Sequence, residues 1–486
     1  MSAEDIANKL WNLCNVLRDD GVTYHQYLNE LTYILFLRLS EVKGFESEIP
    51  PDFRWNKLRR LEDNKELFDT YRNLLATIAT DSANETIKEI YTNASTTLRK
   101  PANLRTLVTS INDIDWFDNH EQDKIATIYE ELLERNAGEK KSGAGQYFTP
   151  RPLINVMVDL LTPKVGERWN DPACGTFGFM IAVNEYLKEK NSDYYDLSTK
   201  EIKFQKTDAL SGCELVQDAH RLALMNAKLH GLDSKIELGD TLSEVGKRFR
   251  NFDGVLANPP FGTKKGGDRP SRDDFTYPTS NKQLNFLQHI YRSLHNKGGA
   301  RAGVILPDNV LFEDGDGQKI RRDLMDKCNL HTILRLPTGI FYAQGVKTNV
   351  LFFERGKLEK DNTKSIWFYD MRTGVDNYGK RTPFTREAFA GFVNAYTGGI
   401  AINDVRNKYD GSVDNDRREK VKDERWICFS RKDIAAKNDT LDIGLMTEVS
   451  PNAAYEEKEL VDIVKEASNE LRAIQIEIDK ILELLK

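Results

Sequence analysis

The stretch Asn251-Phe-Asp-Gly-Val-Leu-Ala-Asn-Pro-Pro-Phe-Gly262 decides the fold of this chain. Its apolar run, Val255 to Ala257, predicts a buried strand that ends abruptly in an Asn-Pro-Pro-Phe corner. Two consecutive prolines remove two backbone donors, so the strand cannot continue and two carbonyls lose their usual ladder partners. With the asparagine carboxamide they form a rigid cluster of acceptors, beside the flat face of the phenylalanine. This combination suits chemistry on the amino group of a planar base, although an Asn-Pro turn after a buried strand would have the same sequence.

Strand and helix patterns alternate along this part of the chain. We expect strands over 210–215, 235–238, 253–257, 301–306, 331–336 and 348–354, the last of them final, and helices over 179–188, 216–230 and 285–294. Such alternation predicts an α/β fold with a doubly wound, mostly parallel sheet. Ligands in these sheets bind at the carboxyl ends of the strands, where Asp171, Glu214, Asp240 and Asn258 all fall.

A glycine-containing turn, Asp171-Pro-Ala-Cys-Gly-Thr-Phe-Gly178, opens one of the predicted helices. Rossmann-like folds receive a nucleotide at such a turn, because glycines let the ligand approach the backbone and the helix N-terminus supplies amides. The G-x-G-x-x-G fingerprint is missing from this turn. An adenosyl ligand without a pyrophosphate is therefore favoured over a dinucleotide, and a nicotinamide oxidoreductase is disfavoured. An ordinary strand-to-helix turn remains the alternative.

Two further acidic residues follow predicted strands. Glu214 could accept both hydroxyls of a ribose, and Asp240 could accept the amino group of an adenine. Carboxylates in these places also often cap the next helix or are solvated. Upstream, Thr149 is expected to cap a helix that begins at Pro150 or Arg151.

The flanking regions predict a division into 1–140, 141–400 and 401–486. The first region has helical spacing of apolar residues and predicts an all-α bundle. About 130 residues follow Glu354 without a clear second core, and they end in a helix over about 455–486 with a heptad seam. The seam consists of Leu460, Val464, Ala467, Leu471, Ile474, Ile478, Ile481 and Leu485. It could bind a partner or pack onto the bundle of its own chain.

Composition and charge restrict how the protein could contact DNA and in which compartment it works. The chain has 486 residues and a net charge of −7, whereas a protein that grips DNA alone is more often basic, so any DNA contact would use local patches or a partner's charge. Its five cysteines lack CxxC or zinc-type spacing, which fits a reducing cytoplasm. Neither a signal sequence nor a membrane span is expected, and we expect a soluble protein.

Asn258-Pro259-Pro260-Phe261 resembles the catalytic motif of S-adenosylmethionine-dependent methyltransferases that act on exocyclic amines, most often N6 of adenine in DNA. The span from Gly145 to Glu354 resembles the gamma order of their motifs, with cofactor elements first. The resemblance implies a Rossmann-like methyltransferase sheet that binds S-adenosyl-L-methionine. The cofactor residues that it implies are Gln146, Tyr147, Phe148, Thr149 and Pro150 at the methionine end, Asp171, Ala173, Gly175, Thr176 and Gly178 in the loop, Glu214 at the ribose and Asp240 at the adenine ring.

The resemblance also implies how the catalytic motif works. The Asn258 side-chain oxygen and the Pro259 carbonyl would accept hydrogen bonds from N6 and draw its lone pair toward the methyl group, without a metal or a covalent intermediate. An adenine in a duplex would have to be flipped out, with Phe261 as its stacking face. One departure is Phe177, which stands where many relatives have a small residue and could narrow the approach to the cofactor; because Gly175 and Gly178 remain, cofactor binding is expected to survive.

Taken over nearly the whole chain, these features resemble the modification subunit of type I restriction–modification systems. In that family two modification subunits join one specificity subunit, which reads the DNA sequence, and a restriction subunit can be added. Other acceptors with the same chemistry stay open: N4 of cytosine, an RNA base or a protein glutamine. A methyltransferase-like scaffold that assembles a complex without turnover is a further alternative.

Overall fold

The structure of the chain, a computed structural model, describes residues 3–13, 24–114, 116, 128–132, 149–262, 269–337, 339–341, 346–372, 378 and 384–442. Contacts group Met1–Thr440 in one unit and Leu441–Lys486 in a second. Only the first two residues of the second unit are described. The predicted C-terminal helix and its heptad seam therefore lie outside the described residues, as do Gln146, Tyr147 and Phe148.

Helices make up the N-terminal region, as the sequence predicts. They are α1 (Ala3–Asn12), α3 (Tyr24–Val42), α4 (Trp55–Leu58), α5 (Asn64–Asp81), α6 (Glu85–Tyr91) and α7 (Pro101–Asn112), with short 3₁₀ turns at Glu46–Glu48 and Pro51–Phe53. Asp63 and Asn84 cap α5 and α6 by accepting backbone N–H groups, and α3 is buried from Leu31 to Leu39. Of the helices described, none has the length and apolar content needed to span a membrane.

The central sheet confirms the predicted doubly wound α/β fold. Its strands among the described residues are β1 (Trp169–Asp171), β2 (Leu210–Glu214), β3 (Lys235–Leu238), β4 (Gly254–Ala257), β5 (Arg301–Pro307), β6 (Cys328–Arg335), β7 (Thr348–Arg355), β8 (Ser365–Asp370) and β9 (Trp426–Ser430). They pair in the order β3-β2-β1-β4-β5-β7-β6-β8-β9. The first five strands of this order are parallel, β7 is antiparallel to both neighbours, and β9 is antiparallel to β8. The order reverses between β1 and β4, and an open sheet binds its ligands at such a reversal.

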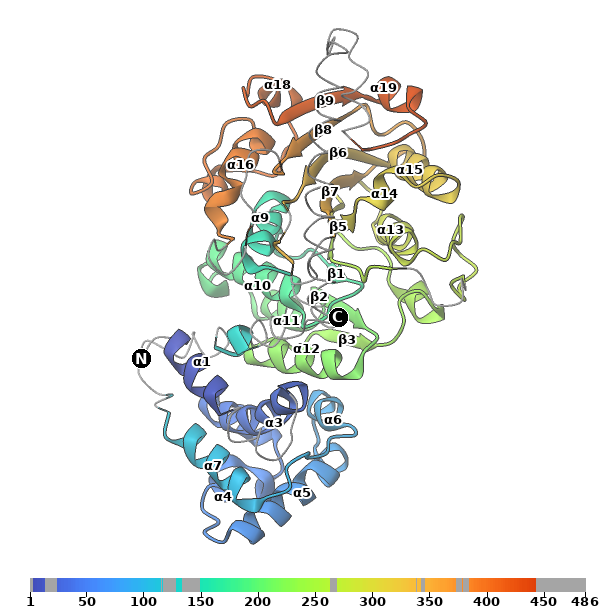
Figure 1. Ribbon diagram of the computed structural model, residues 1–486. Helices are drawn as coiled ribbons and strands as arrows, with labels where there is room; N and C mark the ends of the chain where they lie inside the picture. The colour runs from blue at the N-terminus through green and yellow to red at the C-terminus, as the bar shows by residue number, and fades with distance from the viewer. Residues whose placement is uncertain are drawn as a thin grey trace, which may run out of the picture. The chain divides into compact units, whose positions relative to one another are not determined.

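Helices cover both faces of the sheet. They are α9 (Arg151–Leu161), α10 (Gly178–Lys190), α11 (Thr199–Thr207), α12 (Gln217–Leu229), α13 (Lys282–Ser293), α14 (Asn309–Phe312), α15 (Asp316–Lys327), α16 (Ala390–Thr397), α17 (Val405–Lys408), α18 (Asn415–Arg418) and α19 (Arg431–Ala436). Figure 1 shows α9, α10 and α16 on one face and α13, α14 and α15 on the other. The residues of α9 from Leu153 to Leu161 are buried, apart from Asn155.

The sheet is longer than the sequence predicts. The strand at 348–354 was expected to be the last, but β8 pairs with β6 and β9 pairs with β8. Aromatic residues pack together in this part: Trp367 stacks on Trp426 with ring centroids 4.8 Å apart, and Phe352 packs against Tyr396. These aromatic residues belong to the same continuous core as the rest of the described sheet, so the residues after Glu354 extend that core and form no second one, as expected. The division at residue 400 stays a prediction, and β9 lies beyond it.

Candidate functional site

A cavity of about 280 Å³ opens at the carboxyl ends of β1, β2, β3 and β4. Most of the residues predicted for the site line it. These are Thr149, Asp171, Ala173, Thr176, Gly178, Glu214, Asp240, Asn258, Pro260 and Phe261. The sheet topology brings these residues together, because β1 to β4 are parallel neighbours and their carboxyl ends lie at one edge of the sheet.

Three predicted residues are described but do not line this cavity. Gly175 contributes a backbone hydrogen bond to the site: its N–H donates to Glu214 Oε2 at 2.9 Å. Pro259 is buried, and Pro150 is the residue before α9. The cofactor roles of Gly175 and Pro150 and the catalytic role of Pro259 stay predictions.

The three carboxylates at the strand ends share one local geometry. Asp171 accepts the N–H of Ala173 at 3.0 Å, Glu214 accepts that of Val216 at 2.8 Å, and Asp240 accepts that of Leu242 at 2.8 Å. Each carboxylate is thus held by the backbone N–H of the residue two positions later in the sequence, in a turn that is not part of a helix. None of the three supplies a side-chain cap to α10 or α12, whose first residues follow Phe177 and Val216. The helix-capping alternative is therefore wrong for Asp171 and Glu214.

Burial dominates the electrostatics of this part of the site. It raises the pKa of Asp171 to about 8, with the neighbouring Glu214 adding to the rise and the Ala173 N–H opposing it. Burial also raises the pKa of Glu214, against the bonds from Val216 and Gly175. Two buried carboxyls with raised pKa values are a common property of ligand sites.

Glycines let the first turn approach its neighbours closely. Gly175 has a φ of +52°, a conformation that a residue with a Cβ adopts at a cost. In β2, a Cβ at Gly212 would lie 2.9 Å from the Cys174 sulfur. The turn between β1 and α10 therefore lies against β2 only because position 212 has no side chain.

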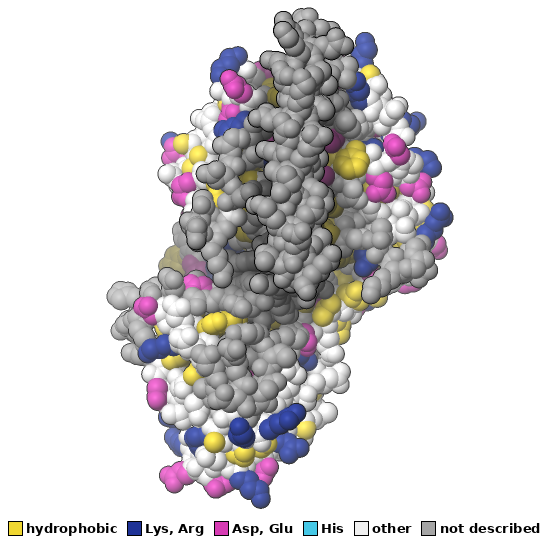
Figure 2. Space-filling model, viewed as in Figure 1, with side chains coloured by type: hydrophobic (Ala, Val, Ile, Leu, Met, Phe, Trp, Pro, Cys, Tyr) yellow, Lys and Arg dark blue, Asp and Glu magenta, His cyan; other side chains and the backbone are white. Residues whose placement is uncertain are grey.

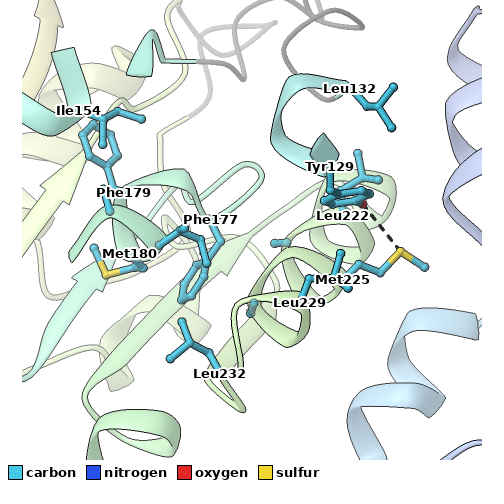
Figure 3. Close-up of a cluster of buried hydrophobic side chains, with 14 of the residues drawn as sticks. Tyr129, Leu132, Ile154, Phe177, Phe179, Met180, Leu222, Met225, Leu229 and Leu232 are labelled. Carbon is cyan, nitrogen blue, oxygen red and sulfur yellow. Dashed lines mark hydrogen bonds between the residues drawn. The ribbon is translucent and has the colours of Figure 1, made fainter. Parts of the chain in front are cut away.

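Phe177 does not narrow the cavity, contrary to the expectation from its size. Its side chain is fully buried and lies outside the cavity lining. Figure 3 shows the ring directed toward Leu232 in a cluster with Met180. The backbone turns the ring away by adopting a left-handed conformation, with φ at +69°, which is uncommon for a residue other than glycine.

Asn258 is hydrogen-bonded to a residue far away in the sequence. Its Nδ2 donates to Thr149 Oγ1 at 3.0 Å, whereas its Oδ1 is buried and has no hydrogen-bond partner among the described residues. Thr149 does not cap α9 as predicted, because Pro150 precedes that helix without a side-chain capping bond. The Thr149 hydroxyl faces Asn258 instead.

Buried amides of α13 hold the chain that follows the Asn-Pro-Pro-Phe corner. The Gln283 amide lies against both backbone groups of Gly262; with its oxygen turned toward the Gly262 N–H, it accepts there at 2.5 Å and donates to the Gly262 carbonyl at 3.2 Å. Gln288 binds both backbone groups of Tyr277, at 3.1 and 2.8 Å. Asn285 does the same to Thr279, at 3.2 and 2.6 Å. One helix thereby fixes both ends of the segment from Gly262 to Thr279 beside the cavity.

Several residues that line the cavity were not predicted from the sequence. Leu215 and Val216 line the cavity although their exposed fractions are 65% and 38%. From α13 come Lys282 and Phe286. A sequence pattern does not distinguish an exposed apolar side chain from a buried one, so Leu215 and Val216 could not be predicted. The side-chain amides of α13, at Gln283, Asn285 and Gln288, are a signal in the sequence for this side of the cavity.

Arg151 anchors the start of α9 close to the cavity. Its guanidinium pairs with Glu130 at 3.1 Å and with Glu185, and it donates to the carbonyl of Gly178 at 3.4 Å. Glu130 and Glu185 also lie close enough to His230 to offer ligands to a cation. Because Arg151 already pairs with both carboxylates, this cluster carries no metal assignment, and the expectation of catalysis without a metal stays a prediction.

Comparisons with known proteins match this chain over its whole length. Residues 120–446 match the family described as N-6 DNA Methylase, and residues 6–111 match the HsdM N-terminal domain. The StySJI methylase subunit of a type I restriction enzyme from Salmonella typhimurium is 42% identical, over 100% of this chain and 96% of that protein. The crystal structure of the EcoKI M protein is 41% identical, with a TM-score of 0.54 over 90% of this chain and 89% of that one. A structure from work on assembly of the type I R-M system is 27% identical, with a TM-score of 0.74 over 100% of both chains.

Proposed function

Since the chain belongs to the N-6 DNA methylase family, among the methylase subunits of type I restriction enzymes, we propose that it methylates N6 of adenine in DNA with S-adenosylmethionine as donor. The observation that carries this proposal is the buried Oδ1 of Asn258, an acceptor without a partner among the described residues of a cavity lined by acids. Other buried polar atoms also lack a partner among the described residues, but of them Asn258 Oδ1 belongs to a residue that lines the cavity, where a bound ligand could donate to it.

The residues of the cavity fit an adenosyl cofactor. Glu214 has its carboxylate held in place by two backbone N–H groups and keeps further lone pairs for the hydroxyls of a ribose. Asp240, on the next strand, would accept from the adenine amino group, and the exposed apolar side chain of Leu215 offers a surface for the adenine ring. Asp171 lies at the glycine turn, where the methionine end would bind. The cofactor supplies a methyl group on a positively charged sulfur.

The chemistry of this chain is then positioning and hydrogen bonding. Asn258 Oδ1 would accept an N–H from the exocyclic amine and draw its lone pair out of conjugation with the ring. The Pro259 carbonyl would accept the second N–H. Phe261 would stack on the base, which must leave the duplex to reach this depth. These groups hold the nitrogen in line for transfer, which is a sufficient source of rate acceleration.

The match to the family of N-6 DNA methylases favours an adenine in DNA over the other amine acceptors. A scaffold without turnover would transfer no label from S-adenosylmethionine to DNA.

We also propose that this chain acts within a complex. The relatives are named as methylase subunits of type I restriction enzymes, and we expect two copies of this chain to join one specificity subunit, with a restriction subunit added in the full enzyme. Basic and acidic side chains are interspersed on the face shown in Figure 2, and the net charge is −7. A partner that reads and grips the DNA fits this charge distribution.

The test is methyl transfer from labelled S-adenosylmethionine to unmethylated DNA, by this chain alone and with the specificity subunit from its own operon. We expect label in DNA only from the mixture, recovered as N6-methyladenine. Label recovered as N4-methylcytosine would contradict the choice of base. Full activity of the lone chain would contradict the division of labour between subunits.

A further inference from the structure

The residues that would hold the cofactor and the target amine come from separate segments of the chain. Asp171 and Asp240 follow β1 and β3, whereas Asn258 follows β4, and the chain after its Asn-Pro-Pro-Phe corner is held by α13. Transfer is sensitive to the alignment of the reacting groups, since a misplacement of about 1 Å can cost about 100-fold in rate. A side chain that ties these segments together would therefore act on the reaction without touching either ligand.

Arg272 ties them together. It lies in the segment between the corner and α13 and is only 3% exposed. Its Nη1 donates to the Thr241 carbonyl at 2.9 Å and to Nδ1 of His289, in α13, at 3.0 Å. Its Nε and Nη2 donate to the Asp274 carboxylate, both at 2.7 Å. Because a guanidinium only donates, chemistry fixes the direction of all these bonds.

On the α13 side, His289 is suited to accept this bond. Burial and the positive charge of Arg272 lower the pKa of His289 to about 3. The ring is therefore neutral near pH 7, with its proton on Nε2 and a lone pair on Nδ1.

On the cofactor side, Thr241 continues the connection. It lines the cavity directly after Asp240, and its hydroxyl donates to the Pro172 carbonyl at 2.6 Å. A carbonyl only accepts, so the direction of this bond is fixed as well. Since Pro172 follows Asp171, the two turns that carry these acids are joined to each other, and Arg272 joins both to α13.

A glycine leaves the space that this contact needs. A Cβ at Gly246 would lie 1.8 Å from the Thr241 carbonyl oxygen and 2.7 Å from Arg272 Nη1. We propose that Arg272 is a positioning residue that holds the cofactor turns at a fixed distance from α13 and from the Asn-Pro-Pro-Phe corner. This inference rests on the proposed function of the same cavity.

The test measures the Kd for S-adenosylmethionine by calorimetry and kcat in the complex with the specificity subunit and DNA. For Arg272→Gln we expect the Kd to rise about fivefold and kcat at saturating cofactor to fall about tenfold. Asp274 still pairs with Arg250 in this variant. Arg272→Lys keeps one donor but not the fork, and should recover part of both effects. Gly246→Ala should reproduce both, because its Cβ displaces the Thr241 carbonyl.

Arg321→Gln is the matched control. Arg321 is 1% exposed and donates to the carbonyls of Val310, Glu313 and Asp439, none of which lines the cavity. This variant should lower the Tm as Arg272→Gln does, but leave the Kd and kcat within about twofold of the wild type.

The readouts separate positioning from stability. A lower Tm with unchanged Kd and kcat would overturn the proposal, and so would a change in only one of the two. Arg272→Gln and Gly246→Ala break the same contact, so their effects should not add in the double variant, and additive effects would also overturn it. If the wild-type protein binds no S-adenosylmethionine or its complex transfers no label, the proposed function fails instead, and this outcome is read before any variant is compared.

Discussion

The two halves of the site are held by different kinds of contact. In the half proposed to bind the cofactor, Asp171, Glu214 and Asp240 are each fixed by a backbone N–H two residues away. In the half proposed to be catalytic, Asn258 donates to Thr149, which lies 109 residues earlier, and Gln283 of α13 binds the backbone of Gly262. The first half is built from local turns, and the second from side chains that only the folded chain brings together.

This difference implies that the two halves can be damaged separately. Loss of a local turn should weaken cofactor binding and leave the catalytic groups in place. Loss of a long-range contact should slow transfer and leave the cofactor turns in place. Variants in the two halves should therefore show opposite patterns of Kd and kcat.

The largest effect is expected from Asn258→Ala. Removing the acceptor should lower methyl transfer by about 10²–10³-fold, the range for a catalytic hydrogen-bonding group. The Kd for S-adenosylmethionine, measured by calorimetry, should change less than about twofold. An Asn258→Ala enzyme with wild-type activity would refute the mechanism, and one that has lost cofactor binding would refute the separation of the two halves.

The next effect is expected from Glu214→Ala. A carboxylate that accepts hydrogen bonds from a ligand contributes about 1.5–3 kcal/mol, so the Kd for the cofactor should rise about 10–100-fold. The kcat at saturating cofactor should stay near the wild-type value. Glu201→Ala is the control, since Glu201 caps α11 with an exposed carboxylate outside the cavity. A lower kcat without a change in Kd would place Glu214 in the catalytic half.

A smaller effect, about tenfold on kcat, is expected from Gln283→Ala. The variant frees Gly262, so the Asn-Pro-Pro-Phe corner loses its support from α13. Gln288→Ala removes an equivalent two-point clasp on Tyr277 from the same helix. Both variants should lower the Tm by similar amounts, but only the first should slow transfer. Equal rates in the two variants would show that α13 serves stability alone.

The same contrast explains what the sequence could predict. The strand ends, the glycine turn and the acids were predictable because period, proline and glycine act over a few residues. The contacts of Thr149 with Asn258 and of Gln283 with Gly262 could not be predicted, because they depend on how α9 and α13 pack against the sheet. Phe177 was misjudged for a related reason: its size is visible in the sequence, but the left-handed backbone that turns it into the core is not. The strands β8 and β9 were missed because their shared aromatic core joins segments about 60 residues apart.

The smallest effect is expected from pH, acting on Asp171 in the protein without cofactor. Its pKa of about 8 in the folded chain lies above the ordinary value of 3.8, so the folded state holds the proton more tightly than the unfolded state. The stability that this group contributes is complete below pH 3.8 and is lost as the pH rises through 8. Asp171→Asn mimics the neutral form and can still accept from the Ala173 N–H.

Between pH 5 and pH 9 the Tm of the wild type should therefore fall relative to that of Asp171→Asn. Subtracting the Tm of the variant from that of the wild type at each pH removes the contribution of the other titrating groups. This holds for Glu214 to the extent that it titrates independently of Asp171. A Tm difference that is constant with pH would mean that Asp171 is already ionised in the folded chain. The cofactor turn would then present a fixed negative charge to its ligand, and cofactor affinity would show no rise between pH 7 and pH 9. A falling difference predicts such a rise, because the carboxylate must lose its proton to meet a positively charged ligand.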